Sequence, residues 1–131
     1  SLLRAAAVLV LGALAFTPAM AQQAAAPAGI QKVTTAKGEV WADAKGMTLY
    51  FYARDTEANK STCVGGCATN WPPIMAAATD RPAGDWTIAD RPDGSKMWAY
   101  KGKPVYLWIN DKAKGDTTGD GVGGNWVLAK P

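Results

Sequence analysis

Residues 45–55 read Lys-Gly-Met-Thr-Leu-Tyr-Phe-Tyr-Ala-Arg-Asp, and residues 101–111 read Lys-Gly-Lys-Pro-Val-Tyr-Leu-Trp-Ile-Asn-Asp. The second stretch repeats the first 56 positions later: both hold a Lys-Gly pair, a tyrosine, an aromatic residue two positions after it and a final aspartate. A tryptophan closes each copy, Trp71 in the first and Trp126 in the second. The duplication predicts a chain built from two related units.

Each copy has the alternation of a β-strand. Tyr50 and Tyr52 lie two positions apart and therefore share one face of a strand. Tyr106 and Trp108 repeat that face in the second copy. The positions between them are apolar and take the opposite face. The Lys-Gly pair supplies a turn before each strand, and the aspartate at its end can accept a hydrogen bond from the backbone of the following loop.

Short strand-like runs separated by turns continue through the rest of the sequence, and the whole chain holds 14 glycines and 8 prolines. Strands are expected over residues 30–35, 39–43, 47–54, 86–90, 96–100, 104–110 and 126–129. Pro72 and Pro73 stop any helix before them, so at most one short helical turn is expected near the Cys loop, around residues 63–70. The pattern predicts an all-β fold, a small domain of two related β-meander units packed together, because one unit alone cannot bury its apolar face.

The first residues have the parts of a secretory signal: Arg4, an apolar run over 5–16 and small residues up to Ala21. The apolar run is too short to span a bilayer comfortably. The expected division of the chain is a signal peptide at 1–21, a flexible leader with the first short strand at 22–37, and an all-β domain at 38–131 with repeats at about 38–74 and 90–131. The expected location is periplasmic or secreted, with no membrane span after the signal is removed.

The charge balance and the absence of histidine exclude several function classes. The formal net charge is +3 and the basic residues are scattered, which is too weak a signal for a nucleic-acid binder. The chain has no histidine, which removes Ser-His-Asp and Cys-His nucleophiles, ordinary zinc sites and His-ligated haem. The domain is also small for an enzyme cleft. We therefore expect a non-enzymatic protein without a cofactor.

Cys63 and Cys67 are the only cysteines of the chain. In an exported protein two cysteines this close most often form a disulfide, and Gly65 and Gly66 allow the backbone between them to fold tightly. The second copy has a glycine-rich loop over residues 115–124 in the corresponding position, which indicates that the bridge is a local staple. A redox-active pair and metal ligation are the alternatives, and they define a second function class, a redox or metal-handling periplasmic protein.

The aromatic and carboxylate residues of the two copies form the candidate ligand-binding set: Tyr50, Tyr52, Asp55, Tyr106, Trp108 and Asp111. In this interpretation the aromatic rings stack on a ring-bearing ligand or an envelope component, and the carboxylates accept its hydrogen bonds. The competing interpretation makes the aromatic residues core and the aspartates turn locks. Asp111, Asp116 and Asp120 are weak candidates for a calcium site, because their spacing does not match an EF-hand loop and no bidentate glutamate follows.

The same residues resemble the bacterial secreted-repeat family of predicted lipoproteins, which has a Tyr-x-aromatic-x-x-Asp motif. Residues 50–55 and 106–111 both fit this motif. The segments 61–73 and 115–121, the latter leading to Trp126, resemble two further signatures of the family, so the similarity covers nearly the whole mature domain. The sequence departs from the family in lacking a lipobox cysteine, which favours a soluble periplasmic or secreted form. The resemblance implies an envelope location and no defined activity.

Overall fold

The computed structural model describes residues 26–131, so the signal peptide expected at 1–21 lies outside the described residues. The strands are β1 (Ile30–Thr35), β2 (Gly38–Asp43), β3 (Tyr50–Tyr52), β4 (Trp86–Asp90), β5 (Lys96–Tyr100), β6 (Lys103–Tyr106) and β7 (Trp126–Leu128). The helical elements are α1 (Gly66–Asn70) and the 3-10 turn η1 (Val122–Gly124). The all-β class and the short helical turn beside the Cys loop are therefore confirmed.

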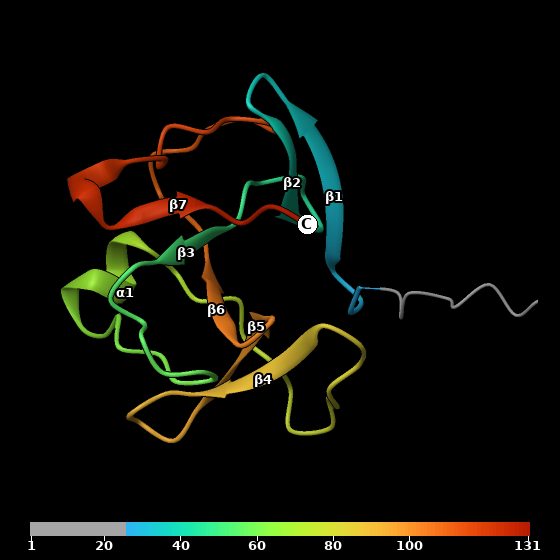
Figure 1. Cartoon of the computed structure of the whole chain (residues 1–131), viewed down its shortest axis with the longest axis vertical. Coiled ribbons are helices and arrows are strands. Elements are labelled where there is room, and N and C mark those ends of the chain that lie inside the picture. The colour runs from blue at the N-terminus through green and yellow to red at the C-terminus, as the bar shows by residue number, and fades with distance from the viewer. Residues whose placement is uncertain (1–25) are drawn as a thin grey trace, which may run out of the picture.

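The strands form two antiparallel sheets. β1 and β2 pair as a hairpin, and the second sheet has the order β4-β5-β6-β3-β7. β3 comes from the first repeat, yet it lies between β6 and β7 of the second repeat, which Figure 1 shows as a green strand beside a red one. The two units are therefore interleaved within one sheet.

The last segment of the first repeat crosses to the second repeat. Beyond Trp71 the chain runs alongside β6 and β5, where the Ile74 N–H donates to the Val105 carbonyl at 3.2 Å. The Trp98 N–H in turn donates to the Ile74 carbonyl at 2.8 Å. The closing segment of one repeat is thus hydrogen-bonded into the other.

The second repeat makes the reciprocal crossing. The Ala129 N–H, just after β7, donates to the Leu49 carbonyl at 2.9 Å, and the Trp41 N–H donates to the Ala129 carbonyl at 2.8 Å. Leu49 and Trp41 both belong to the first repeat. Because each repeat completes the backbone hydrogen bonding of the other, neither can satisfy its backbone groups alone.

Both central strands are shorter than the sequence suggested, so the expected bounds 47–54 and 104–110 were wrong. The Leu49 N–H donates to the Trp41 carbonyl at 2.9 Å, which holds the residues before β3 against β2 and outside the second sheet. In the second copy, the Ile109 N–H, beyond the end of β6, donates to the Asn70 carbonyl at 3.1 Å instead of continuing the β6 ladder. Each predicted strand ends where its backbone changes partner.

The alternating faces of the two copies separate two buried clusters. Tyr50 and Tyr106 belong to the first cluster, together with Cys63, Trp71 and Trp126. The apolar positions between them face the second cluster, which contains the following buried residues: Ile30, Trp41, Leu49, Trp86, Trp98, Tyr100, Val105 and Ala129. Both faces of each copy therefore contact a buried cluster.

Candidate functional site

The tyrosine of each repeat is hydrogen-bonded to the aspartate of the other. The Tyr50 hydroxyl donates to Oδ2 of Asp111 at 2.6 Å, and the Tyr106 hydroxyl donates to Oδ2 of Asp55 at 2.6 Å. Both tyrosines are fully buried, Asp111 is buried and Asp55 is half-buried. We call these two bonds the crossed Tyr–Asp pairs. They connect the repeats through side chains. The segments around Ile74 and Ala129, which we call the exchanged segments, connect the repeats through backbone hydrogen bonds.

The second oxygen of each carboxylate fixes the loop that follows it. Oδ1 of Asp55 accepts both the N–H and the hydroxyl of Thr62, each at 2.7 Å. Oδ1 of Asp111 accepts the N–H and the hydroxyl of Thr118 at 3.0 and 2.6 Å. The expectation that each aspartate binds the backbone of the following loop is therefore confirmed in both repeats.

Each tyrosine oxygen also accepts one hydrogen bond, from a different kind of donor in each repeat. Ser61 Oγ lies 2.7 Å from the Tyr106 hydroxyl. Since the Tyr106 proton is directed to Asp55, the Ser61 hydroxyl is the donor of this bond. Tyr50 instead accepts the Gly119 N–H at 3.1 Å. Every polar atom of the crossed pairs is thus engaged within the protein.

Burial raises the pKa of both tyrosines above the ordinary value of 10.0, because the charged phenolate would lose its hydration. The hydrogen bond to an aspartate raises each pKa further, since the carboxylate accepts a hydrogen bond from the neutral phenol and would repel a charged phenolate. The Gly119 N–H partly opposes this shift at Tyr50, and Ser61 does so at Tyr106. Both tyrosines therefore stay neutral at physiological pH.

Four aromatic rings stack in a continuous column in the order Tyr52, Trp126, Trp71, Trp108. The central pair, Trp126 and Trp71, has ring centroids 3.7 Å apart and an interplanar angle of 4°. Tyr52 lies 4.4 Å from Trp126, and Trp108 lies 4.0 Å from Trp71. We call these four rings the aromatic column. Its two central rings are buried and its two terminal rings are half-buried.

The tyrosines of the crossed pairs contact the column edge-on. Tyr50 meets Trp71 at a centroid distance of 5.5 Å, and Tyr106 meets Trp126 at 5.3 Å. Both contacts are close to perpendicular, a geometry that aromatic quadrupoles favour. The column and the crossed pairs together form one assembly in which each repeat supplies matched parts.

Two segments of the chain, residues 31–75 and 87–130, match the family model described as a secreted repeat of unknown function. The chain belongs to this family. The resemblance inferred from the sequence is thereby confirmed, and membership in a secreted-repeat family supports export of the chain. No match was found among curated proteins or among solved structures. Among residues 26–131, no helix has the length and apolar character that crossing a membrane requires.

The structure brings the six candidate ligand residues of this secreted-repeat protein into one region, with different exposures. Four of them, the two tyrosines and two aspartates of the crossed pairs, bind one another. The remaining two, Tyr52 and Trp108, end the aromatic column and are half-buried. Sequence reasoning missed Thr62 and Thr118, although each follows its motif aspartate by seven positions, a regularity that would have revealed them.

Cys63 and Cys67 form the predicted disulfide, with Cα atoms 5.2 Å apart. Cys63 is fully buried in the first cluster, whereas Cys67 is half-buried. The Trp71 N–H donates to the Cys67 carbonyl at 2.8 Å. The bridge therefore holds together the loop that delivers Trp71 to the column.

The three weak calcium candidates are not brought together as a ligand set. Asp111 accepts the hydrogen bond of Tyr50 in its crossed pair. Asp116 Oδ2 accepts the N–H groups of Lys112 and Ala113, each at 2.9 Å, and Asp120 pairs with Lys37 at 3.2 Å. Within the part of the chain that the structure describes, no group of three or more His, Cys, Asp or Glu side chains is placed to hold a metal ion.

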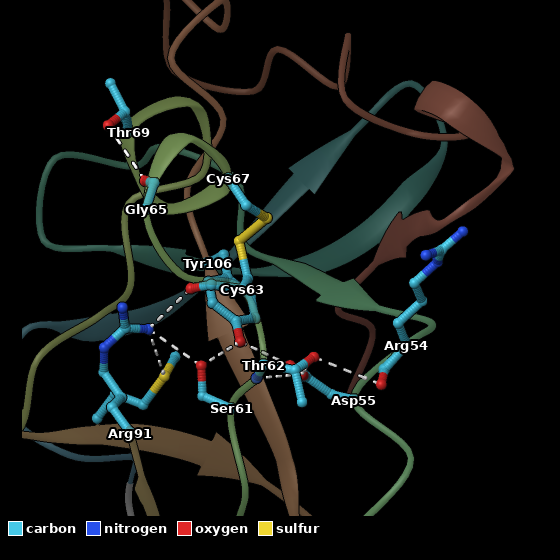
Figure 2. The surroundings of a disulfide bond; sticks show 11 residues. Arg54, Asp55, Ser61, Thr62, Cys63, Gly65, Cys67, Thr69, Arg91 and Tyr106 are labelled. Atoms are coloured by element: carbon cyan, nitrogen blue, oxygen red, sulfur yellow. Dashed lines mark hydrogen bonds between the residues drawn. A yellow bond between two sulfur atoms is a disulfide. The ribbon is translucent and has the colours of Figure 1, made fainter. Parts of the chain in front are cut away.

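Arg91 is a third residue that sequence reasoning missed. Its Nη1 donates to Ser61 Oγ at 3.0 Å and to the Cys63 carbonyl at 3.2 Å, as Figure 2 shows beside the disulfide. Through Ser61 this cation is linked to Tyr106 and hence to one crossed pair. Arg91 lies between the two stretches that reveal the duplication, so the repeat pattern could not have pointed to it.

Proposed function

We propose that this secreted-repeat protein is a non-enzymatic binding protein of the cell envelope that holds an anionic group in the hollow beside Arg91. The observation that carries the proposal is a half-buried guanidinium that lines a hollow of about 380 Å³. Membership in a secreted-repeat family and the signal peptide expected at residues 1–21 support a periplasmic or secreted location.

The hydrogen bonds of the Arg91 side chain within the protein all come from Nη1. Nη1 of Arg91 is used by Ser61, Cys63 and the Met97 sulfur, at 3.8 Å for the last. No ion pair joins Arg91 to a carboxylate among residues 26–131. A guanidinium presents five N–H donors in a planar fork that suits carboxylate and phosphate groups, so the donors outside Nη1 are suited to an incoming oxyanion.

The rest of the lining suits a small polar ligand. Lys60, itself ion-paired with Glu57, adds a second cation, and Thr56 adds a hydroxyl group. The hydroxyl of Thr62, also in the lining, already donates to Asp55. The two acidic residues of the lining are already paired within the protein, Glu57 with Lys60 at 3.0 Å and Asp90 with Lys96. We therefore propose a ligand that presents a carboxylate or phosphate to Arg91.

Binding is tested by NMR titration of the mature protein with acetate, lactate and inorganic phosphate at low ionic strength. Saturable shifts are expected for the amides of Arg91, Thr62 and their neighbours. Arg91→Lys keeps the charge but removes the fork and should weaken binding. Lys60→Gln should weaken it less, and Lys32→Gln, on β1 and outside the hollow, should leave it unchanged. Equal shifts in all four proteins, or no saturation, would contradict the proposal.

A ring-bearing ligand is the second candidate, favoured by the half-buried ends of the aromatic column. Tyr52 and Trp108 each have one ring face stacked within the column. We propose that their other faces accept a sugar or another flat ligand. A thermal-shift screen with saccharides should then give a stabilisation that Tyr52→Ala and Trp108→Ala abolish, whereas no shift across the panel would count against this candidate.

A redox or metal-handling role for Cys63 and Cys67 is the competing class. The full burial of Cys63 favours a structural bridge, because an attacking thiolate needs access to the sulfur. Intact-mass measurement with alkylator and graded reductant distinguishes the two. A structural bridge should resist mild reductant, whereas ready and reversible reduction in the folded protein would support the redox role.

A further inference from the structure

The central pair of the aromatic column is its most closely stacked pair. Trp71 and Trp126 lie 3.7 Å apart between ring centroids, with planes only 4° from parallel. The other two contacts of the column have centroid distances of 4.0 and 4.4 Å. The two indole faces are therefore in direct van der Waals contact. Overlap of two filled π systems raises the highest occupied orbital, and it allows a positive charge to be shared over both rings.

The column gives this pair a connection to the surface. Tyr52 continues the stack from Trp126, and Trp108 continues it from Trp71. Both terminal rings are half-buried, whereas the central rings are each 5% exposed. An oxidant that meets a terminal ring is therefore in electronic contact with the pair, while the pair itself is shielded from water.

A proton acceptor is in place beside the column. A phenol is a good one-electron donor only when its proton leaves with the electron. Tyr50 contacts Trp71 edge-on at 5.5 Å, and its hydroxyl already donates to Oδ2 of Asp111 at 2.6 Å. Tyr106 stands in the same relation to Trp126 and Asp55. Each side of the column thus has a phenol with a carboxylate ready to accept its proton.

The surroundings favour Tyr50 over Tyr106 as the final donor. Both members of the Tyr50–Asp111 pair are buried, so a phenoxyl radical on Tyr50 would be shielded from water, whereas Asp55 of the other pair is half-buried. The Tyr106 hydroxyl is also linked through Ser61 to the Arg91 cation. A nearby positive charge opposes the loss of an electron, so Tyr50 is the better donor.

We propose that the aromatic column is a one-electron donor, in which the stacked pair of Trp71 and Trp126 gives an electron to a radical oxidant at the protein surface and Tyr50 then refills the pair. The oxidant, a species of the peroxyl or thiyl class, is reduced by one electron. The O–H bond of Tyr50 breaks, its proton forms a new O–H bond on Asp111, and its electron passes to the oxidised indole pair. The protein is left with a neutral phenoxyl radical. This activity does not depend on the anion site at Arg91.

Pulse radiolysis with azide radicals tests the proposal on the mature protein. A tryptophan radical should form first and convert to a phenoxyl radical at a rate independent of protein concentration. The conversion should slow in heavy water, because the Tyr50 proton moves with the electron. A conversion that scales with protein concentration, or one without an isotope effect, would overturn the proposal without any variant.

Variants then assign the phenol. Tyr50→Phe removes one oxygen from the buried site and should abolish most of the phenoxyl signal, while Tyr100→Phe, in the other buried cluster, should keep it. Circular dichroism of each variant checks that it is folded. Loss of the signal in Tyr106→Phe in place of Tyr50→Phe would overturn the assignment to Tyr50, and a full signal in both would overturn the proton-coupled step.

Discussion

In the first repeat the loop after the motif aspartate is closed by the disulfide Cys63–Cys67, whereas the corresponding loop of the second repeat has glycines and no cysteine. Both loops nevertheless present a threonine to the motif aspartate in the same way, Thr62 in one and Thr118 in the other. The comparison teaches that the motif residues specify the contact between repeats. The loop chemistry can vary as long as it orders the threonine.

The loops differ most where they meet the tyrosine of the crossed pair. Ser61 donates a side-chain hydroxyl to Tyr106, but Gly119 donates its backbone N–H to Tyr50. A Cβ atom at Gly119 would lie 2.8 Å from Cζ of Tyr50 and 3.0 Å from Trp71. The second repeat therefore needs a glycine for close approach, while the first repeat has Cys63 at the position 56 residues earlier.

The largest effect is expected for Gly119→Ala. The added methyl group would overlap the buried Tyr50 ring, and overpacking of this kind should lower the free energy of unfolding by about 3 kcal/mol. Gly66→Ala is the matched control, because no atom lies within 4 Å of its Cβ position. Urea denaturation measures both. Equal stabilities for the two variants would show that Gly119 is not needed for close approach.

The next largest effect separates the two aspartates. Asp111→Asn should lower the free energy of unfolding by about 2.5 kcal/mol, since it weakens charge-assisted bonds at a buried site. Asp55→Asn should lower it by about 1.5 kcal/mol, because the more exposed carboxylate can be replaced by water. Urea denaturation of both variants under one buffer condition makes the comparison. A larger loss for Asp55→Asn than for Asp111→Asn would mean that the charge of Asp55, near Arg91, contributes more to the free energy of unfolding than that of the buried Asp111.

Removal of the disulfide should have a smaller effect. Closing a loop of this length stabilises a protein by about 2 kcal/mol on the chain-entropy model, so the double variant Cys63→Ser, Cys67→Ser should lose about that much in urea denaturation. Because the second repeat orders its loop without a bridge, the variant should remain folded. Complete unfolding would show that the first repeat has no alternative way to order its loop.

Alkaline pH should destabilise the protein through the two buried tyrosines. Their pKa values are raised in the folded state, so the unfolded chain loses these protons first once the pH exceeds 10.0. The stability is fully present below that pH and should then fall by about 1.4 kcal/mol per pH unit for each tyrosine. Stability curves at several alkaline pH values measure the slope. Tyr50→Phe should reduce the slope, and an unchanged slope would show that Tyr50 does not cause the alkaline loss of stability.

The sequence predicted the architecture better than the connections. The repeat and the alternating faces correctly indicated two β units. The two cysteines with a glycine pair between them correctly indicated a disulfide. The sequence could not tell whether Tyr50 pairs with Asp55 or with Asp111, because the two aspartates are equivalent under the repeat. The pairing follows from the exchanged segments, which bring the tyrosine of one repeat to the aspartate of the other. These segments are held by backbone hydrogen bonds, which no pattern of side chains in the sequence reveals.

The order of the rings in the aromatic column was also beyond the sequence. Trp71 and Trp126 were recognised as closing residues of their repeats, but their spacing did not show which rings stack on one another. They meet because each closing segment crosses to the other repeat, where Ile74 and Ala129 are held by backbone bonds. Arg91 had no counterpart 56 positions away and so gave no signal at all.

The central claim is that the tyrosine of one repeat is bonded to the aspartate of the other, and double-mutant cycles test it most directly. Tyr50→Phe combined with Asp111→Asn should show a coupling of about 1–2 kcal/mol in urea denaturation, because the two groups share a hydrogen bond. Tyr50→Phe combined with Asp55→Asn should be nearly additive. Strong coupling of Tyr50 to Asp55 with none to Asp111 would contradict the crossed pairing.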